Sequence, residues 1–111
     1  MSPVTSLPGW RWSPGMAYTV AGKVRRVVTV GGGEEHGEPC LDDPCTGGAL
    51  LYLLGVEATR IWYSPILRKQ TAGTPWAADL DYDPCTDEHV TFHASLGRAC
   101  FAVAVALGRW S

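Results

Sequence analysis

The 111-residue sequence predicts an α+β fold, in which one small antiparallel β-sheet carries two α-helices on one face. Three observations lead to this prediction: an apolar stretch with helix-start and helix-stop signals at residues 41–55, several short segments with strand patterns, and a helical apolar period over residues 96–110. The length is that of one domain, and 46% hydrophobic with 18% charged residues is typical of a globular chain. We therefore expect a single domain, 1–111.

The core is expected to form around the stretch LDDPCTGGALLYLLG, residues 41–55. Asp43 can cap a helix, and Pro44 suits the first helical position, where its missing N–H costs nothing. Residues 49–54 then make the helix apolar on nearly every side, and Gly55 fits the position just past the last turn. A helix this apolar is normally enclosed, with a sheet on one side and another element on the other.

The segment before this helix predicts a β-hairpin. Residues 1–8 are expected to form a loose arm, and Ser13-Pro14-Gly15 a turn. Alternation over residues 16–20 and β-branched residues over 24–30 indicate two strands joined by a tight turn at Gly22. Residues 31–39 (GGGEEHGEP) are expected to be a flexible acidic loop.

The second half predicts three more strands and a closing helix. Strands are expected at residues 59–67, where Pro65 marks an interruption or a sheet edge, at 76–82 and at 89–94. Ser95 can cap a helix over residues 96–109. Its inner face follows the i, i+3, i+4, i+7 spacing and consists of Leu96, Ala99, Cys100, Val103, Ala106, Leu107 and Trp110.

Charge and composition narrow the function classes. A net charge of −2 argues against broad electrostatic binding to nucleic acid or to an anionic membrane. The longest apolar run, residues 99–107, is less than half of the roughly 20 residues that a bilayer span requires. Residues 1–20 show no secretory signal, so we expect a cytoplasmic protein without membrane contact and with reduced cysteines. The even number of cysteines, four, leaves disulfides as the alternative.

Three blocks of the sequence resemble a group of small uncharacterised phage and prophage proteins from bacteria with GC-rich genomes. The blocks are WRWSPGM (10–16), LDDPCTGGALLYLL (41–54) and FHASLGRACFAVAVAL (92–107), in the order that the group shows. The group's pattern is a WRW-x-PGM start, an LDDPAT helix start and an alanine-rich closing helix. This chain departs by Cys45 in place of the alanine and by Cys85 and two histidines in residues 83–93. The resemblance implies a phage accessory protein, and it carries no known activity.

Zinc is the first chemical alternative. His36, Cys40 and Cys45, with Cys85, His89 and His93, supply six side chains of the right chemistry. If residues 90–92 form a strand, however, His89 and His93 lie about 13 Å apart and cannot share one ion. We therefore expect no metal or other cofactor. A zinc-stabilised nucleic-acid-binding protein, with Cys40, Cys45, Cys85 and His89 as ligands, is kept as the alternative.

Other patterns favour plain structural interpretations. Asp79, Asp81 and Asp83 begin like a calcium loop, but the sixth and twelfth positions are Pro84 and Val90 instead of Gly and Glu. A basic and aromatic set could form a nucleic-acid surface or solvated sheet edges, and the acidic balance favours the second. This set comprises Arg11, Lys23, Arg25, Arg26, Arg68 and Lys69 with Trp10, Trp12 and Trp62.

The outer face of the closing helix is the predicted binding site. Phe101 and Val105 project opposite the buried face, between Arg98 and Arg109, and such a composition is typical of partner-binding spots. The alternative is that another segment, such as the arm with Trp10, covers these residues. The sequence thus predicts a non-catalytic protein-binding module, and counter-defence is its most concrete role: inhibition of a host nuclease or other defence protein, as by an anti-CRISPR. The partner is a host or phage protein, or a second copy in a homo-oligomeric structural phage protein.

Overall fold

The computed structural model describes residues 3–28, 37–63, 74–80 and 90–110. The elements follow in the order β1 (Ala17–Val20), β2 (Lys23–Arg26), β3 (Glu38–Pro39), α1 (Pro44–Leu54), the 3-10 helix η2 (Gly55–Arg60), β4 (Ile61–Tyr63), β5 (Trp76–Asp79), β6 (Val90–His93) and α2 (Leu96–Leu107). The α+β class is confirmed. The strands nevertheless form two three-stranded antiparallel sheets where one was expected: sheet A in the order β2-β1-β3 and sheet B in the order β4-β5-β6.

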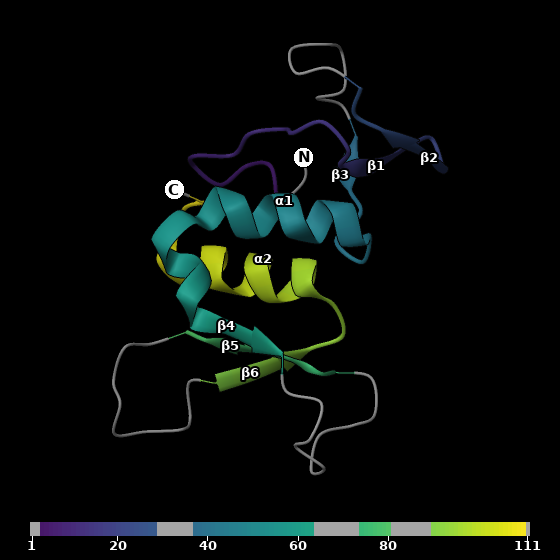
Figure 1. Ribbon diagram of the computed structural model, residues 1–111. Coiled ribbons are helices and arrows are strands. Elements are labelled where there is room, and N and C mark those ends of the chain that lie inside the picture. Colours follow the sequence, from purple (N-terminus) through teal and green to yellow (C-terminus); the bar gives the residue numbers. More distant parts are fainter. Residues whose placement is uncertain (1–2, 29–36, 64–73, 81–89, 111) are drawn as a thin grey trace.

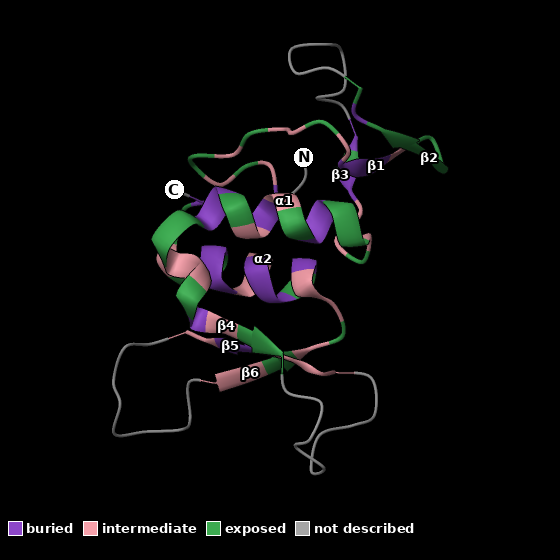
Figure 2. Ribbon diagram, in the orientation of Figure 1, coloured by how far each residue is buried: buried purple, intermediate pink, exposed green. Residues whose placement is uncertain are grey.

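The helices separate the two sheets. Helix α1 lies on α2, and α2 lies on sheet B, so that both helices are on one side of that sheet (Figure 1). Sheet A is attached at the N-terminal end of α1. The facing sides of the helices are buried (Figure 2), with Leu50, Leu53 and Leu54 on α1 and Ala99, Cys100 and Val103 on α2. The core therefore lies between the two helices and extends onto sheet B.

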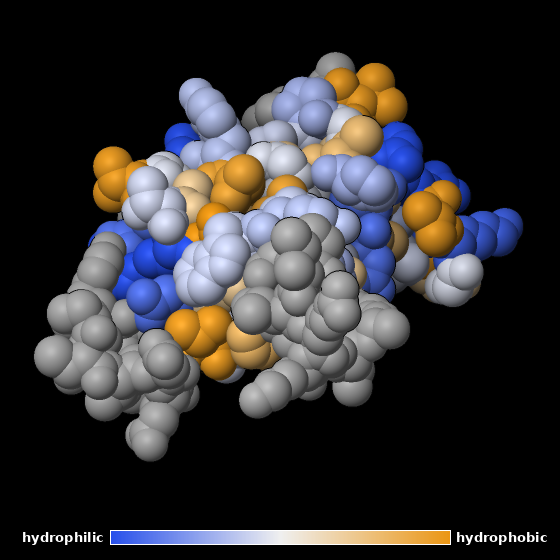
Figure 3. Space-filling model, turned by 60° about the horizontal axis from the view of Figure 1, so that its bottom comes forward, coloured by the Kyte–Doolittle hydropathy of each residue, from blue (hydrophilic) through white to orange (hydrophobic). Residues whose placement is uncertain are grey.

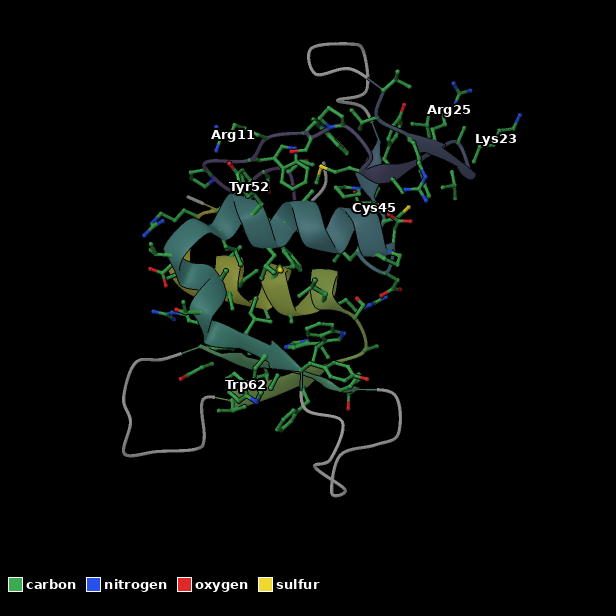
Figure 4. The ribbon with its side chains drawn as sticks, viewed as in Figure 1. Arg11, Lys23, Arg25, Cys45, Tyr52 and Trp62 are labelled. Atoms are coloured by element: carbon green, nitrogen blue, oxygen red, sulfur yellow. The ribbon has the colours of Figure 1, made fainter. Side chains whose placement is uncertain are left out.

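Helix α1 starts and ends where the sequence predicts. The Asp43 carboxylate accepts a hydrogen bond from the Thr46 N–H at 3.0 Å, Pro44 holds the first position, and Gly55 has a φ of 62°. The expected enclosure of this helix is wrong. Among the described elements, the main packing partner of α1 is α2, whereas sheet B packs on α2, and Tyr52 is 87% exposed on the outer side of α1 (Figure 4). Glycines let the two helices approach closely, since a Cβ on Gly47 of α1 would lie 3.2 Å from the Gly97 backbone nitrogen of α2.

The predicted hairpin is confirmed, with a shorter second strand. Strands β1 and β2 pair from Ala17↔Arg26 to Val20↔Lys23, and the two turn residues Ala21 and Gly22 both have positive φ, 51° and 80°. This is the backbone of the tight turn that matches strand twist. Strand β2 ends at Arg26, ahead of the predicted 30, and residues 29–36 lie outside the described residues. The expected acidic loop contributes β3, at its end, to sheet A.

The N-terminal segment is not a loose arm over its described residues. Val4 is buried, and its carbonyl accepts a hydrogen bond from Trp110 Nε1 at 2.8 Å. The Trp110 backbone N–H donates to the carbonyl of Pro8, also at 2.8 Å. These bonds join the two ends of the described chain, and a Trp side chain has enough apolar surface to hold the segment in place.

Beyond α1, the predicted strands are present but shorter. Residues 59–60 belong to η2, and β4 covers only 61–63 of the predicted 59–67; residues 64–73 and 81–89 lie outside the described residues. Strands β5 and β6 lie inside the predicted 76–82 and 89–94. In sheet B, Ala77 and Ala78 are completely buried beneath their neighbours.

Helix α2 begins at its predicted cap and has a slightly rotated inner face. Ser95 Oγ accepts from the Arg98 N–H at 3.3 Å, and Gly108, with a φ of 74°, ends the helix ahead of the predicted 109. Ala106 is exposed, so the prediction that it is buried is wrong. Gly97 and Ala104 are buried instead. Gly97 fits closely against the Leu41 backbone, so the side of α2 that carries Gly97 faces the segment before α1.

Candidate functional site

An open groove lies along the outer face of α2, beside strand β6. Its volume is about 490 Å³, in the range of ligand-binding clefts. Helix α2 contributes Arg98, Phe101, Ala102 and Val105, and the rest of the lining is Leu41, Leu80, Thr91 and His93. We refer to this set as the α2 groove. Val105 is 54% exposed and Phe101 is half-buried, so the groove offers apolar surface that is open to solvent.

The groove brings together three of the four predicted binding residues. Arg98, Phe101 and Val105 line it, since they lie on the side of α2 opposite the core. Arg109 follows Gly108, where the helix has ended, and its exposed side chain does not line the groove. The helical period therefore places three of the predicted residues on one side of this groove, and it does not extend to Arg109, past the helix stop.

Phe101 is partly covered by the chain's own aromatic residues. Its ring stacks on Trp110 with centroids 6.4 Å apart and an interplanar angle of 24°. Trp110 in turn meets Trp10 edge-on at 5.5 Å, and Trp10 meets Trp12 at 5.1 Å. The alternative prediction was that another segment, such as the arm with Trp10, covers Phe101 and Val105. It holds in part for Phe101, because Trp110 covers the Phe101 ring and Trp10 contacts Trp110. Val105 keeps more than half of its surface exposed.

Arg98 is held in place by an ion pair. Its Nε donates to Asp42 Oδ1 at 2.7 Å, and its Nη2 donates to Asp42 Oδ2 at 3.0 Å. This two-point geometry orients the guanidinium and lowers the pKa of the Asp42 carboxyl, an effect that the Ser95 hydroxyl supports. Both side chains remain more than half exposed, so the pair contributes little to stability and mainly fixes orientation.

The polar pair on β6 was not predicted. Thr91 and His93 are two residues apart on one strand, so both side chains face the groove. His93 Nε2 lies 2.7 Å from Thr91 Oγ1 in a hydrogen bond. Burial, with a contribution from the nearby Arg98 charge, lowers the pKa of His93. From the sequence, His93 is only a zinc candidate; the available signal for the pair was the two-residue spacing of Thr91 and His93 on a predicted strand.

The LDDPCT segment explains how the groove is positioned. The Leu41 carbonyl accepts a hydrogen bond from Ser95 Oγ at 3.2 Å, which joins the starts of the two helices. Leu41 then lines both the α2 groove and a crevice of about 300 Å³ between the helix starts. Asp42 holds Arg98 as described. Leu41 and Asp42 therefore hold the N-terminal end of α2, and with it one end of the α2 groove.

The rest of the motif ties α1 to sheet A. The two Asp43 oxygens accept hydrogen bonds from Arg26 Nη1 at 3.0 Å and Nη2 at 2.8 Å. These bonds, together with the Thr46 N–H, lower the pKa of Asp43 to about 2. The completely buried Thr46 Oγ1 donates to Asp43 and accepts from the Ala17 N–H at 2.8 Å. Thr46 was missed in the sequence, where a threonine three residues after a capping aspartate was the available signal.

Half of the six zinc candidates belong to the described part of the chain. Cys85, His89 and His36 lie outside the described residues, where the second and third aspartates of the D-x-D-x-D run also lie. Among the described residues, no group of three or more His, Cys, Asp or Glu side chains could hold a metal ion. Cys45 is exposed near the start of α1, and Cys40 is half-buried with its pKa raised by burial and by Asp43. Burial raises the pKa of the Cys100 thiol to about 12.

The basic and aromatic set does not form one surface in the described structure. Lys23 and Arg25 lie on the hairpin of sheet A, whereas Trp62 lies on sheet B at the opposite end of the molecule (Figure 4). Arg26 is paired with Asp43, and residues 68–69 lie outside the described residues. The combined nucleic-acid surface considered from the sequence is therefore divided between distant parts of the fold.

In the described part of the chain, no helix is both long enough and apolar enough to span a bilayer. Comparisons with protein-family models, with curated proteins and with solved structures find no match for this chain.

Proposed function

We propose that this protein is a non-catalytic binding module that captures a partner protein in the α2 groove. The observation that carries the proposal is the open apolar surface of Val105 and Phe101 inside a groove of about 490 Å³. Leu41, Leu80 and Ala102 extend this surface, so an apolar side chain of the partner would meet apolar atoms on several sides. Anchors of this kind supply most of the affinity in protein interfaces.

The available energy fits a protein partner. Complete burial of a side chain such as Val105 contributes roughly 1.5–3 kcal/mol, and Phe101 adds less because part of its ring is already covered. The loss of translational and rotational freedom on association opposes these gains. A contact through the groove alone would therefore be weak, and a partner protein can supply the additional interface that stable capture needs.

The polar groups of the groove support binding rather than catalysis. Arg98 is committed to Asp42, and His93 is committed to Thr91. A general base needs a proton acceptor within hydrogen-bond reach of a substrate, and a nucleophile needs such a base beside it. Thr91 and His93 lie within this distance of each other, but among the described residues no third group hydrogen-bonds the imidazole and orients it as a base. The pair therefore fits a fixed polar margin of the groove better than a catalytic pair.

The biological role in this proposal is counter-defence in a phage or prophage. It rests on the resemblance of the WRWSPGM and LDDPCT blocks to small phage proteins. A host nuclease or another defence protein would be the partner, and occupation of its surface would inhibit it. Self-association through the same groove is the competing outcome.

The test uses two valines with matched chemistry. Val105→Asp puts a charge into the α2 groove, and Val56→Asp puts the same charge on the 82%-exposed Val56 of η2, which is not among the groove residues. Both variants and the parent protein would be used to capture partners from bacterial lysate, with circular dichroism as the folding control. We expect Val105→Asp to lower the affinity for one defined partner at least roughly tenfold, which corresponds to about 1.4 kcal/mol of binding free energy. Val56→Asp should bind that partner as the parent protein does. Equal capture by both variants would contradict the proposal, and a dimer seen by sedimentation only in the parent and Val56→Asp would assign the groove to self-association.

A further inference from the structure

Strand β2 leaves an open sheet edge. In sheet A it pairs with β1 on one side, and it has no neighbour on the other side in the described part of the chain. The hairpin is closed by the pair Val20↔Lys23, and the Val27 N–H donates to the Met16 carbonyl at 2.8 Å in the same register. Because hydrogen-bonded and non-hydrogen-bonded pairs alternate, the backbone N–H and C=O groups of Val24 and Arg26 point to the open edge.

The side chains of this edge combine basic and apolar character. All four residues of β2 are exposed (Figure 2), and Val24 keeps 67% of its surface. Lys23 and Arg25 are two residues apart and so share one face, from which both project away from the fold (Figure 4). Among the described residues, neither of them has a carboxylate partner. Figure 3 shows hydrophobic beside hydrophilic side chains at this right-hand end of the molecule, where Figure 1 places the hairpin.

Charge decides which kind of strand this edge can accept. A second copy of β2 paired across a two-fold axis would bring three basic residues of one strand against three of the other, and like charges on paired strands are destabilising. A strand with alternating acidic and apolar residues would instead pair its carboxylates with Lys23 and Arg25. Its apolar side chains would cover Val24.

We infer that the open edge of β2 receives an extended acidic segment of another protein, which adds to sheet A as a further strand. Main-chain hydrogen bonds to Val24 and Arg26 give such an addition its affinity, and Lys23 and Arg25 select for acidic side chains. This second interaction surface is independent of the α2 groove. A nucleic acid would use the same two positive charges, but it would leave the unpaired backbone groups of the edge without partners.

The test probe is a fluorescein-labelled peptide, Thr-Val-Glu-Val-Glu-Val-Thr, titrated with the full-length protein by fluorescence anisotropy. Two control peptides carry lysine in place of glutamate, or N-methyl groups on alternate residues that remove the pairing N–H groups. We expect the glutamate peptide to bind at least roughly tenfold more tightly than either control. Equal binding of the N-methylated peptide would overturn strand addition, and tighter binding of a single-stranded oligonucleotide than of the glutamate peptide would assign the surface to nucleic acid.

Two variants make the assignment specific to β2. Lys23→Glu combined with Arg25→Glu should reverse the preference toward the lysine peptide, because only the sign of the edge charge changes. Val24→Pro removes an N–H that points to the open edge and leaves the hydrogen bonds between β1 and β2 intact, so binding should fall about tenfold in a folded protein. Circular dichroism checks the fold of both variants. If Val24→Pro does not fold, the double variant with reversed charge still tests the inference. An unchanged preference of that variant for the glutamate peptide over the lysine peptide would refute it.

Discussion

The close approach of α2 to the Leu41 backbone predicts that the same substitution, Gly→Ala, has opposite effects at two positions. Gly97 lies in the first turn of α2, and a Cβ there would collide with the Leu41 carbonyl oxygen and lie 2.8 Å from its carbon. This carbonyl cannot shift freely, because it accepts the Ser95 hydroxyl. Gly48 lies in α1 and is exposed, and a Cβ there has no neighbour within 4 Å.

The magnitudes follow from two general effects. Alanine is favoured over glycine in a helix interior by about 0.8–1 kcal/mol. This gain applies to Gly48, and it is at most this large at Gly97, which lies in the first turn of α2. Overpacking costs typically 1–3 kcal/mol and applies only at Gly97, where the clash is with backbone. We therefore expect Gly48→Ala to stabilise the protein by about 0.5–1 kcal/mol and Gly97→Ala to destabilise it by up to about 2 kcal/mol.

Thermal unfolding followed by circular dichroism measures both changes. For a domain of this size, each 1 kcal/mol corresponds to a shift in Tm of about 3–6 °C. The two variants should therefore move Tm in opposite directions. A Gly97→Ala variant as stable as the Gly48→Ala variant would refute the close packing of α2 against Leu41, and with it the position of the groove.

Two further predictions concern Asp43 and zinc. Asp43→Ala should destabilise the fold by at least about 1 kcal/mol, the usual cost of a lost helix cap, and an unchanged urea midpoint would contradict the cap. Because folding lowers the pKa of Asp43 from 3.8 to about 2, its stabilisation is complete above about pH 4 and is lost as the pH falls toward 2; urea midpoints should therefore show a smaller loss over this range for Asp43→Ala than for the parent. We also expect elemental analysis to find no stoichiometric zinc and chelator to leave Tm unchanged, whereas one bound equivalent with a lower Tm after chelation would establish the zinc alternative.

Local signals made the helices predictable. Asp43, Pro44 and Gly55 bound α1, and Ser95 starts α2, because caps depend on residues within one turn of the helix end. Gly108 was available as the stop signal of α2, and the predicted end at 109 did not use it. The hairpin was predictable for the same reason, since the turn at Gly22 fixes its register.

Long-range contacts account for what the sequence did not reveal. The segment at residues 3–8 is held by Trp110, more than 100 residues away, and no local pattern encodes that hydrogen bond. The division into two sheets likewise depends on the packing of α2 between α1 and sheet B. For the groove, the helical wheel located Phe101 and Val105. Leu41 and His93 reach the same place from other elements, so their part became visible only in the folded chain.

The central claim, capture of a partner protein in the α2 groove, is tested most directly by site-specific photo-cross-linking. A benzophenone side chain would replace Val105 in one variant and Val56 in the other, and both folded proteins would be irradiated in bacterial lysate. Val105 opens into the groove, whereas Val56 is more exposed and does not line it. The account predicts one discrete adduct from position 105 that is absent from position 56. The same adducts from both positions, or an adduct from position 56 alone, would contradict it.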